Sequence, residues 1–577
     1  MTEPQMMPHT QAEDLRLDEV VARARGGEHA WAATSLARRR ELLRELAAKV
    51  AEHSAEWVQT AARIKQLPAD SPLVGEEWIS GPWSVINYAQ ALADTLRLLD
   101  QGSDPLAGYG IGTAPGGRTS IEVLPHGIFD KLLLNGFRAE VWTVPGVDEA
   151  QLRAEAGLAQ RDPATTHGAA LVLGAGNLFS IAPLDVLHQL FACNRAVVLK
   201  LNPITDPLLD VFEKIFASFI DLGVVGIITG GAETGAALAQ HAGITTVHMT
   251  GGQATHDAIV WGVGQAGADA RAAGAPQLTK PITSELGGVC PVIVVPGTWS
   301  KADLRFQAEH VATQRLHNSG FNCVAAQVVV VSSDWPQKGE FVEALRTALA
   351  QAPARPGWYP GCETRVSGAR ALHPAAEAVG GTPERTLLPG LDATDTAESA
   401  FTTEYFGPVL GLVELPGAGA DFLDAAVTFA NERLYGTLGA NIVVHPSTAA
   451  RLGPHLDQAV ADLRYGTVGI NAWTGVGYLT PRATWGAFPG HTLQDVQSGI
   501  GVVHNALLLD RTERTVVRGP FRPAPRSLLN GELALSPKPA WFVTNRTAAT
   551  TGRLLTAFSA RPRWTALPAI FASALRG

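Results

Sequence analysis

The chain has 577 residues, which is more than one compact core usually holds, so two or three domains are expected. Hydrophobic residues make up 46% of the chain and charged residues 17%, a globular composition rather than a disordered or fibrous one. The net charge of −9 at pH 7 argues against a nucleic-acid partner, which requires a basic face, and against an anionic membrane surface.

Cysteine usage and the N-terminus indicate the compartment. Four cysteines are widely spaced and form no CxxC pair, which excludes a disulfide framework or a structural zinc site: Cys193, Cys290, Cys323 and Cys362. The N-terminal segment is polar and acidic, without the apolar core of a signal peptide, and no run of about 18 apolar residues occurs. We therefore expect a cytoplasmic protein with no membrane span.

The first third of the chain is predicted to be helical and then stranded. Apolar residues recur at helical spacing over 31–66 and again over 73–100. Glycine-rich residues 104–117 predict a loop, and residues 119–145 have strand character. After this segment, short apolar runs alternate with helical stretches; the runs are 169–173, 196–201, 224–228 and 245–249. This alternation predicts a parallel sheet that binds ligands at the carboxyl ends of its strands.

A second set of apolar runs predicts a second α/β domain, with a cleft between the two. Its runs are 292–295, 327–331, 442–444 and 468–470. The tail after residue 510 is interrupted by prolines, and residues 553–577 are typical of short amphipathic helices.

Two polar residues stand where predicted strands end. In LVLGAGNLFSIAPLDVL (171–187), Asn177 precedes a helix; its amide can cap that helix or donate to a developing oxyanion. In RAVVLKLNP (195–203), Lys200 ends a buried strand; its ammonium can reach a ribose or phosphate oxygen, or extend to solvent.

Two further motifs are typical of cofactor contacts. In VHMTGGQATHDAIVWG (247–262), Thr250, Gly251 and Gly252 precede a helix, where backbone amides can approach a phosphate or where the glycines only form a tight turn. In TTEYFGPVLGLVEL (402–415), Glu404 can accept hydrogen bonds from ribose hydroxyls and Phe406 can pack beside a nicotinamide, or the segment is a simple turn before a strand.

Two residues are candidates for catalysis. In TSELGGVCPVIVV (283–295), Glu285 beside two glycines is either a base or a surface glutamate. In HNSGFNCVAAQVVVV (317–331), Cys323 lies between a helix and a strand and is either a nucleophile or a buried free cysteine. The other cysteines are interpreted as inert: Cys193 in a helix, Cys290 at the start of a strand and Cys362 in a loop.

The order of these motifs resembles the aldehyde dehydrogenase superfamily from about residue 31 to about residue 500. The interval from Asn177 to Lys200 (200 − 177 = 23 residues) matches the family, and GINAW at 469–473 is similar to it. The resemblance implies an aldehyde dehydrogenase-like α/β fold with a Rossmann-type cofactor-binding domain (1–130 and 167–284), an α/β catalytic domain (285–500) and a small oligomerisation element (131–166 and 501–520). Residues 521–577 form a C-terminal extension, and a homo-oligomer, either a dimer or a tetramer, is expected.

The resemblance also implies a reaction. Cys323 would attack an aldehyde, Asn177 and the Cys323 backbone amide would hold the oxyanion, and Glu285 would activate the water that hydrolyses the thioester. NAD or NADP would accept the hydride, and no metal is implied. The implied cofactor contacts are Lys200, Gly230, Thr250, Gly251, Gly252, Leu286, Glu404 and Phe406.

Some positions depart from the family pattern. The usual glutamate three residues after the lysine is Pro203, which leaves NAD and NADP both open, and the usual lysine nine residues after the asparagine is Val186. The interval from Glu285 to Cys323 (323 − 285 = 38) is longer than usual. Three aromatic residues are expected to line a tunnel for an apolar or bulky aldehyde: Phe179, Phe321 and Trp473.

Two alternatives remain. A CoA-acylating aldehyde dehydrogenase or acyl-CoA reductase has a similar fold but often lacks the glutamate, so Glu285 in a full ELGG motif favours hydrolysis. A catalytically inactive cofactor-binding scaffold is compatible with Val186 and Pro203, whereas the presence of Glu285 and Cys323 with the asparagine argues against it.

Overall fold

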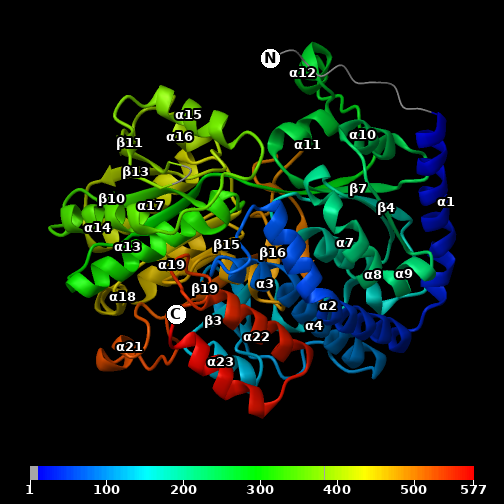
Figure 1. Cartoon of the computed structure of the whole chain (residues 1–577), viewed down its shortest axis with the longest axis horizontal. Coiled ribbons are helices and arrows are strands. Elements are labelled where there is room, and N and C mark those ends of the chain that lie inside the picture. The colour runs from blue at the N-terminus through cyan, green and yellow to red at the C-terminus, as the bar shows by residue number, and fades with distance from the viewer. Residues whose placement is uncertain (1–10, 382–383) are drawn as a thin grey trace.

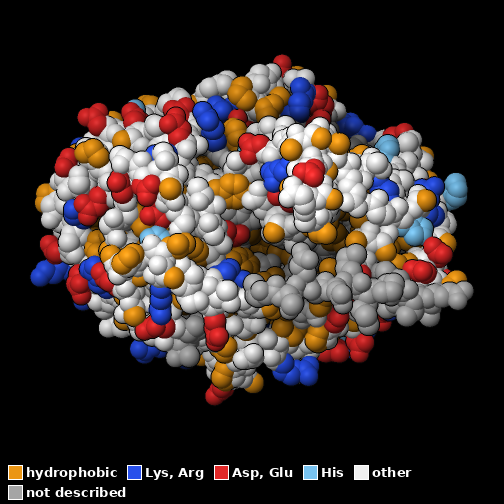
Figure 2. Space-filling view, turned by 90° about the horizontal axis from the view of Figure 1, so that it is seen from above, with side chains coloured by type: hydrophobic (Ala, Val, Ile, Leu, Met, Phe, Trp, Pro, Cys, Tyr) orange, Lys and Arg blue, Asp and Glu red, His pale blue; other side chains and the backbone are white. Residues whose placement is uncertain are grey.

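The computed structural model describes residues 11–381 and 384–577, and Figure 1 shows them as two α/β units with helices packed around them. Residues 1–10 of the predicted polar N-terminus lie outside the described residues. Among the described helices, none has the length and apolar character needed to cross a bilayer. On the face shown in Figure 2, basic and acidic side chains are interspersed among the described residues rather than gathered by sign.

The first unit is built on a six-stranded sheet with the order β17-β8-β7-β4-β5-β6. Its first four strands along the chain confirm the four predicted runs, and they are β4 (Ala169–Leu173), β5 (Ala196–Lys200), β6 (Val225–Ile228) and β7 (Thr246–Gly251). These strands and β8 (Ile282–Leu286) are parallel. The short strand β17 (Gly499–Ile500) adds to β8 in the antiparallel direction.

The second unit is built on an eleven-stranded sheet. Four neighbouring strands confirm the second set of runs, and their order is β15 (Thr467–Ile470), β14 (Gly439–Val443), β9 (Cys290–Val294) and β10 (Ala326–Ser332). All are parallel and fully buried, so their carboxyl ends share one edge. The sheet continues through the parallel strands β13 (Val409–Leu415) and β12 (Thr386–Leu391) to the two-residue strand β11 (Glu377–Ala378).

The predicted oligomerisation segments meet at the other end of this sheet. Strand β3 (Arg138–Thr143), from 131–166, pairs antiparallel with β19 (Thr512–Arg518), from 501–520. Strands β1 (Ile111–Ala114) and β2 (Arg118–Leu124) extend the sheet beyond β3, although the sequence predicted a loop at β1. The predicted stranded segment 119–145 also contains a short helix, α5 (Ile128–Leu133).

The first helix begins earlier than its sequence pattern predicts. Helix α1 (Gln11–Ala33) precedes α2 (Leu36–Ile64), and it packs along β5 and β6 at the edge of the six-stranded sheet (Figure 1). Gly27 lowers the helix propensity of this segment, so the sequence pattern does not indicate the helix. The glycine is needed for packing, because a Cβ there would lie 2.2 Å from the backbone oxygen of Gly223. Glycine disfavours the helix locally but permits the close packing that holds it.

The C-terminal extension wraps back over the rest of the chain, drawn in red in Figure 1. It includes α21 (Arg526–Leu529), α22 (Ala548–Ala560) and α23 (Leu567–Ala574). Helices α22 and α23 confirm the short helices predicted for 553–577, whereas α21 was not predicted. Helix α22 lies against α3 (Val74–Trp78), where Gly75 leaves room for the backbone of Ala548.

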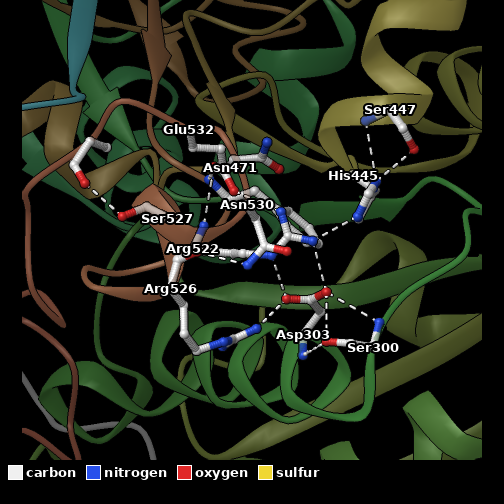
Figure 3. A network of polar contacts seen from close by, with 12 residues as sticks. Ser300, Asp303, His445, Ser447, Asn471, Arg522, Arg526, Ser527, Asn530 and Glu532 are labelled. Carbon is white, nitrogen blue, oxygen red and sulfur yellow. Dashed lines mark hydrogen bonds and ion pairs between the residues drawn. The ribbon is translucent and has the colours of Figure 1, made fainter.

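A buried ion network anchors the extension (Figure 3). Arg522 donates to both carboxylate oxygens of Asp303, from Nε at 2.8 Å and from Nη2 at 2.9 Å. Arg526 contacts the same carboxylate, which also forms a capping box with Ser300 at the start of α13 (Lys301–Leu316). A bidentate, buried arginine–carboxylate pair fixes geometry as well as position.

Asp303→Asn is expected to lower the free energy of unfolding by about 3 kcal/mol, because it leaves two arginines beside an uncharged amide. Glu414→Gln, which removes an exposed partner of Lys338, should cost less than about 1 kcal/mol. Chemical denaturation measures both changes. Equal effects of the two substitutions would contradict the anchoring role.

Candidate active site

Cys323 lies in a tight loop that follows α13 and precedes β10. Asn318 and Ser319 in this loop have φ values of 54° and 58°, which only a well-supported turn sustains in residues other than glycine. The Asn318 amide nitrogen donates to the backbone oxygens of Asn177 at 3.0 Å and Phe321 at 3.1 Å. The loop is therefore fixed to the turn that carries Asn177.

Asn177 points at the Cys323 loop. Its Nδ2 donates to the backbone oxygen of Phe321 at 2.9 Å, and the residue is 7% exposed. The helix-capping interpretation is wrong, because α7 (Ile181–Phe191) begins four residues later with Ser180 at its N-cap. The side-chain amide nitrogen has two hydrogens, so one bonds to the Phe321 oxygen and the other is available to a second acceptor.

Glu285 is a buried residue of β8, not a surface glutamate. It is 1% exposed, and its Oε1 has no hydrogen-bond partner among the described residues. Burial raises the pKa of this carboxyl to about 8, and the neighbouring Cys323 thiol and Trp485 indole oppose that rise only in part. Glu285 therefore exchanges protons near neutral pH.

The Cys323 thiol is half-buried beside Glu285. Burial raises the pKa of this thiol well above its ordinary value, and the negative charge of Glu285 adds to the rise. In the free protein the sulfur thus keeps its proton, and the Glu285 carboxyl is hydrogen-bonded to it.

The remaining cysteines are located apart from this pair. Cys290 begins β9, as predicted. Two placements were wrong: Cys193 follows the end of α7 rather than lying within it, and Cys362 begins helix α15 (Cys362–Leu372) rather than lying in a loop.

A polar layer under Glu285 was missed by the sequence analysis. Thr250 on β7 is the Cα partner of Glu285, and its hydroxyl donates to Asp185 Oδ2 at 3.0 Å. His248 Nε2 lies 3.5 Å from the same oxygen, and His504 Nε2 lies 3.8 Å from Oδ1. Burial lowers the pKa of His504 to about 4, so this imidazole is neutral at pH 7. Two sequence features could have indicated this layer: Asp185 is a charged residue within an apolar helix, and His248 is a histidine within an apolar strand.

A second buried ion pair, Glu76 with Arg355, holds the Cys323 loop in place. Glu76 forms a bidentate pair with Arg355, with distances of 2.8 and 2.9 Å, and its Oε2 also accepts from the backbone N–H of Asn318 at 2.9 Å. The two charges come from positions 279 residues apart, so no sequence spacing indicated them.

Five predicted cofactor contacts lie at the carboxyl edge of the six-stranded sheet. Lys200 ends β5 and is 7% exposed, Thr250 and Gly251 end β7, and Gly252 is the N-cap of α11 (Gln253–Val260) without a side-chain cap. Gly230, after β6, has φ = 149° and could not carry a Cβ, which would lie 2.2 Å from Thr234 Oγ1. Three parallel strands of this sheet, β5, β6 and β7, thus present a cation, a glycine turn and a helix N-terminus at the same edge.

Of the other three predicted contacts, Leu286 ends β8 of the first unit, and Glu404 and Phe406 come from the second unit. A Cβ on Gly287 would lie 2.1 Å from Glu404 Oε1. Glu404 therefore contacts the backbone two residues after Glu285. Burial raises the pKa of Glu404 to about 8. Phe406 follows with φ = 39°, and the Leu286 backbone N–H donates to Ser498 at 2.8 Å.

A small cavity of 30 Å³ opens beside the thiol. Its walls include Cys323, His317, Trp473, Tyr478 and Trp485. Trp473 confirms one predicted wall residue. The other two, Phe179 and Phe321, are not among the residues that line it: Phe321 packs within the core against Trp358, and the ammonium of Lys65 lies over the Phe179 ring.

Comparisons with known proteins agree with this geometry. Residues 158–364, which carry Asn177, Lys200, Glu285 and Cys323, match the model of the aldehyde dehydrogenase family. Over this segment the chain is similar to the aldehyde dehydrogenase superfamily.

Curated relatives are distant and are matched over part of their length. An N-succinylglutamate 5-semialdehyde dehydrogenase of Chromobacterium violaceum is 27% identical over 291 residues, which are 47% of this chain and 56% of the relative. A probable aldehyde dehydrogenase of Streptomyces coelicolor is 25% identical over 361 residues, 57% of this chain and 62% of the relative. The matches thus span less than two thirds of these relatives.

Solved structures show the aldehyde dehydrogenase fold. A putative aldehyde dehydrogenase from Burkholderia cenocepacia superposes with a TM-score of 0.56 at 22% identity, covering 87% of this chain and 91% of that one. An NADP-dependent glyceraldehyde-3-phosphate dehydrogenase from Bacillus halodurans, complexed with NADP, gives 0.56 at 19% identity, covering 88% and 91%.

The pairing of Glu285 with Cys323 predicts a reactivity change. Glu285→Gln should speed alkylation of Cys323 by iodoacetamide above pH 8, because it removes a negative charge that raises the pKa of the thiol. Each unit by which that pKa falls raises the thiolate fraction about tenfold. Mass-resolved alkylation rates between pH 7 and 10 measure it, with Cys323→Ala as the control. A slower or unchanged rate would contradict the pairing.

Proposed function

We propose that this protein oxidises an aldehyde to a carboxylic acid with NAD or NADP, through a thioester on Cys323. The observation that carries the proposal is the contact between the Cys323 thiol and the buried carboxyl of Glu285, whose Oε1 has no hydrogen-bond partner among the described residues. A thiol and a base in contact form the minimal unit of nucleophilic catalysis.

The chain's own groups account for the first half of the reaction. Glu285 removes the thiol proton, and the sulfur attacks the aldehyde carbon to form a thiohemiacetal. The free hydrogen of Asn177 Nδ2, together with the Cys323 backbone N–H, stabilises the negative oxygen. A nicotinamide bound at the carboxyl edge of the six-stranded sheet supplies the hydride acceptor.

Glu285 also serves the second half. Glu285 first releases the proton of the thiol to solvent. Water then attacks the thioester carbon as its proton passes to Glu285, the carbon–sulfur bond breaks to release the acid, and the thiolate takes the proton from Glu285 to restore the thiol. A carboxyl with a pKa of about 8 is suited to both proton removals at neutral pH, because a base is most effective when its pKa lies near the working pH.

The residues at the sheet edge fit a dinucleotide. The N-terminus of α11 has no side-chain cap, so its amides are available to a pyrophosphate. Lys200, a mostly buried cation, would hold an adenosine ribose oxygen, and Glu404, touching Gly287, would hold the nicotinamide ribose. Because Pro203 stands where the family often has a glutamate, both NAD and NADP are candidates.

The CoA-acylating alternative differs in how the acyl group leaves. A thiol acceptor such as CoA needs no buried base to activate water, so the position of Glu285 favours hydrolysis.

We also propose a homo-oligomer, a dimer or a tetramer, assembled through the β1–β2–β3–β19 end of the large sheet, where the two predicted oligomerisation segments lie side by side.

Reduced-cofactor absorbance with a panel of linear, branched and aromatic aldehydes tests the reaction. Turnover should appear without CoA, and Cys323→Ala should lower kcat by more than 10³-fold because the nucleophile is lost. Cys193→Ala is the matched control and should retain activity. Turnover only in the presence of CoA would move the protein to the acylating branch, and full activity of Cys323→Ala would refute the nucleophile.

Lys200→Ala should weaken cofactor binding about tenfold, since it removes a charge-assisted hydrogen bond. Lys214→Ala, in an exposed pair with Glu56, is the control. Fluorescence titration with NAD and with NADP measures both affinities. An unchanged affinity for each cofactor would show that Lys200 does not contact it.

A further inference from the structure

A second cavity, of 160 Å³, separates the C-terminal extension from the body of the protein. We call it the extension cavity. Residues 535–545 and helices α22 and α23 supply nearly half of its walls. The opposite walls come from the start of α4 (Ser84–Asp100), from β2, from the α5 region and from residues 476–482.

The extension cavity adjoins the small cavity at Cys323. Three side chains line both: Ile79, Leu479 and Trp541. Trp541 belongs to the extension, is 9% exposed, and packs edge-on against Phe137. The C-terminal extension therefore reaches the pocket of the nucleophile itself.

The walls of the extension cavity suit an apolar ligand. Leu133, Phe137, Leu555 and Ile570 are representative of the lining. At the rim, Leu132 and Leu535 are exposed by 36% and 59%, which extends the apolar surface outward.

The two cations and the Asn87 amide of the lining are already paired, whereas Trp541 Nε1 has no hydrogen-bond partner among the described residues. Arg482 donates to Asp94 at 2.8 Å, and Lys538 pairs with Glu309 at 3.4 Å. The Asn87 amide donates to the Trp83 backbone at 2.7 Å and to Ser559 at 3.1 Å. Among the described lining residues, both cations are thus engaged, which disfavours a phosphorylated or carboxylated tail.

We propose that the substrate is a linear, long-chain aliphatic aldehyde whose carbonyl lies at Cys323 and whose tail occupies the extension cavity. This inference rests on the proposed aldehyde oxidation. A slender tail is favoured over a ring, because the inner cavity holds only 30 Å³ and adjoins the outer one at Ile79, Leu479 and Trp541, which a tail has to pass.

The ion pairs at the start of the C-terminal extension fix the wall that the extension contributes to the cavity. The pairing of Arg522 and Arg526 with Asp303 holds the start of the extension on α13, the helix that leads to the Cys323 loop (Figure 3). Further along, Phe542 stacks on Phe306 of the same helix, with ring centroids 5.3 Å apart. Trp541 is thereby positioned by the helix that also positions the nucleophile.

Chain-length dependence tests the proposal. With linear aldehydes from propanal to dodecanal, kcat/KM should rise about fourfold for each methylene that enters the extension cavity, and then level off. Equal kcat/KM for propanal and decanal would overturn the inference but leave aldehyde oxidation intact. Absence of turnover for every aldehyde, with or without CoA, would instead refute the proposed function.

Ala574→Trp fills the cavity from its outer end, since Ala574 on α23 is one of its half-buried lining residues. It should lower kcat/KM for decanal more than tenfold and change that for propanal less than twofold. Ala572→Trp, on the exposed side of the same helix, is the matched control and should change neither. Equal losses for both aldehydes in Ala574→Trp would contradict the assignment of the tail.

A binding measurement on the unaltered protein is independent of any variant's folding. Decanoate, the product of decanal oxidation, should raise Tm at concentrations where propanoate does not, because only its tail reaches the extension cavity. Ala574→Trp, if folded, should lose the decanoate shift. Identical shifts with the two acids would overturn the proposal.

Discussion

The burial of the Glu285 carboxyl next to a thiol is the constraint on which the site depends. A carboxyl removed from water without a cationic partner is costly to ionise, so the pKa of Glu285 rises to about 8 although the Cys323 thiol and the Trp485 indole oppose that rise. The chain produces this burial by close backbone contacts. Strand β17 lies directly on β8 because Gly499 has no side chain; a Cβ there would lie 2.1 Å from the Ser284 oxygen.

The chain segment that carries the buried Glu285 also joins the two α/β units. The segment after Glu285 leaves one sheet and enters the other as β9, and it is held on both sides. The Leu286 backbone N–H donates to Ser498 at 2.8 Å, the Ser498 hydroxyl donates to Gly287 at 2.9 Å, and the Val289 backbone N–H donates to Tyr435 at 2.7 Å. These bonds fix Glu285 relative to Cys323, which approaches from the start of β10. The position of base against nucleophile is thus a property of the junction between the sheets.

The features that the sequence predicted are those that local pattern determines. Buried parallel strands appear in the sequence as short apolar runs, and for this reason eight of them were located. The motif around Cys323 could also be recognised, because it is the local sequence of a turn. The missed features depend on residues far apart in the chain. Glu76 meets Arg355, Asp185 meets His504, and Trp541 reaches the Cys323 pocket only after the whole chain has folded. Helix α1 was missed because Gly27, which allows its packing, also lowers its helix propensity.

The most direct test of the account is to ask whether Glu285 releases an acyl group from Cys323. The measurement is intact-protein mass spectrometry of Glu285→Gln after incubation with decanal, propanal and either cofactor. We predict an acyl adduct that adds the mass of the aldehyde less two hydrogens, located on Cys323 and absent in the Glu285→Gln/Cys323→Ala double variant. An unmodified mass together with undiminished turnover of Glu285→Gln would contradict it, since hydrolysis would then proceed without the buried carboxyl.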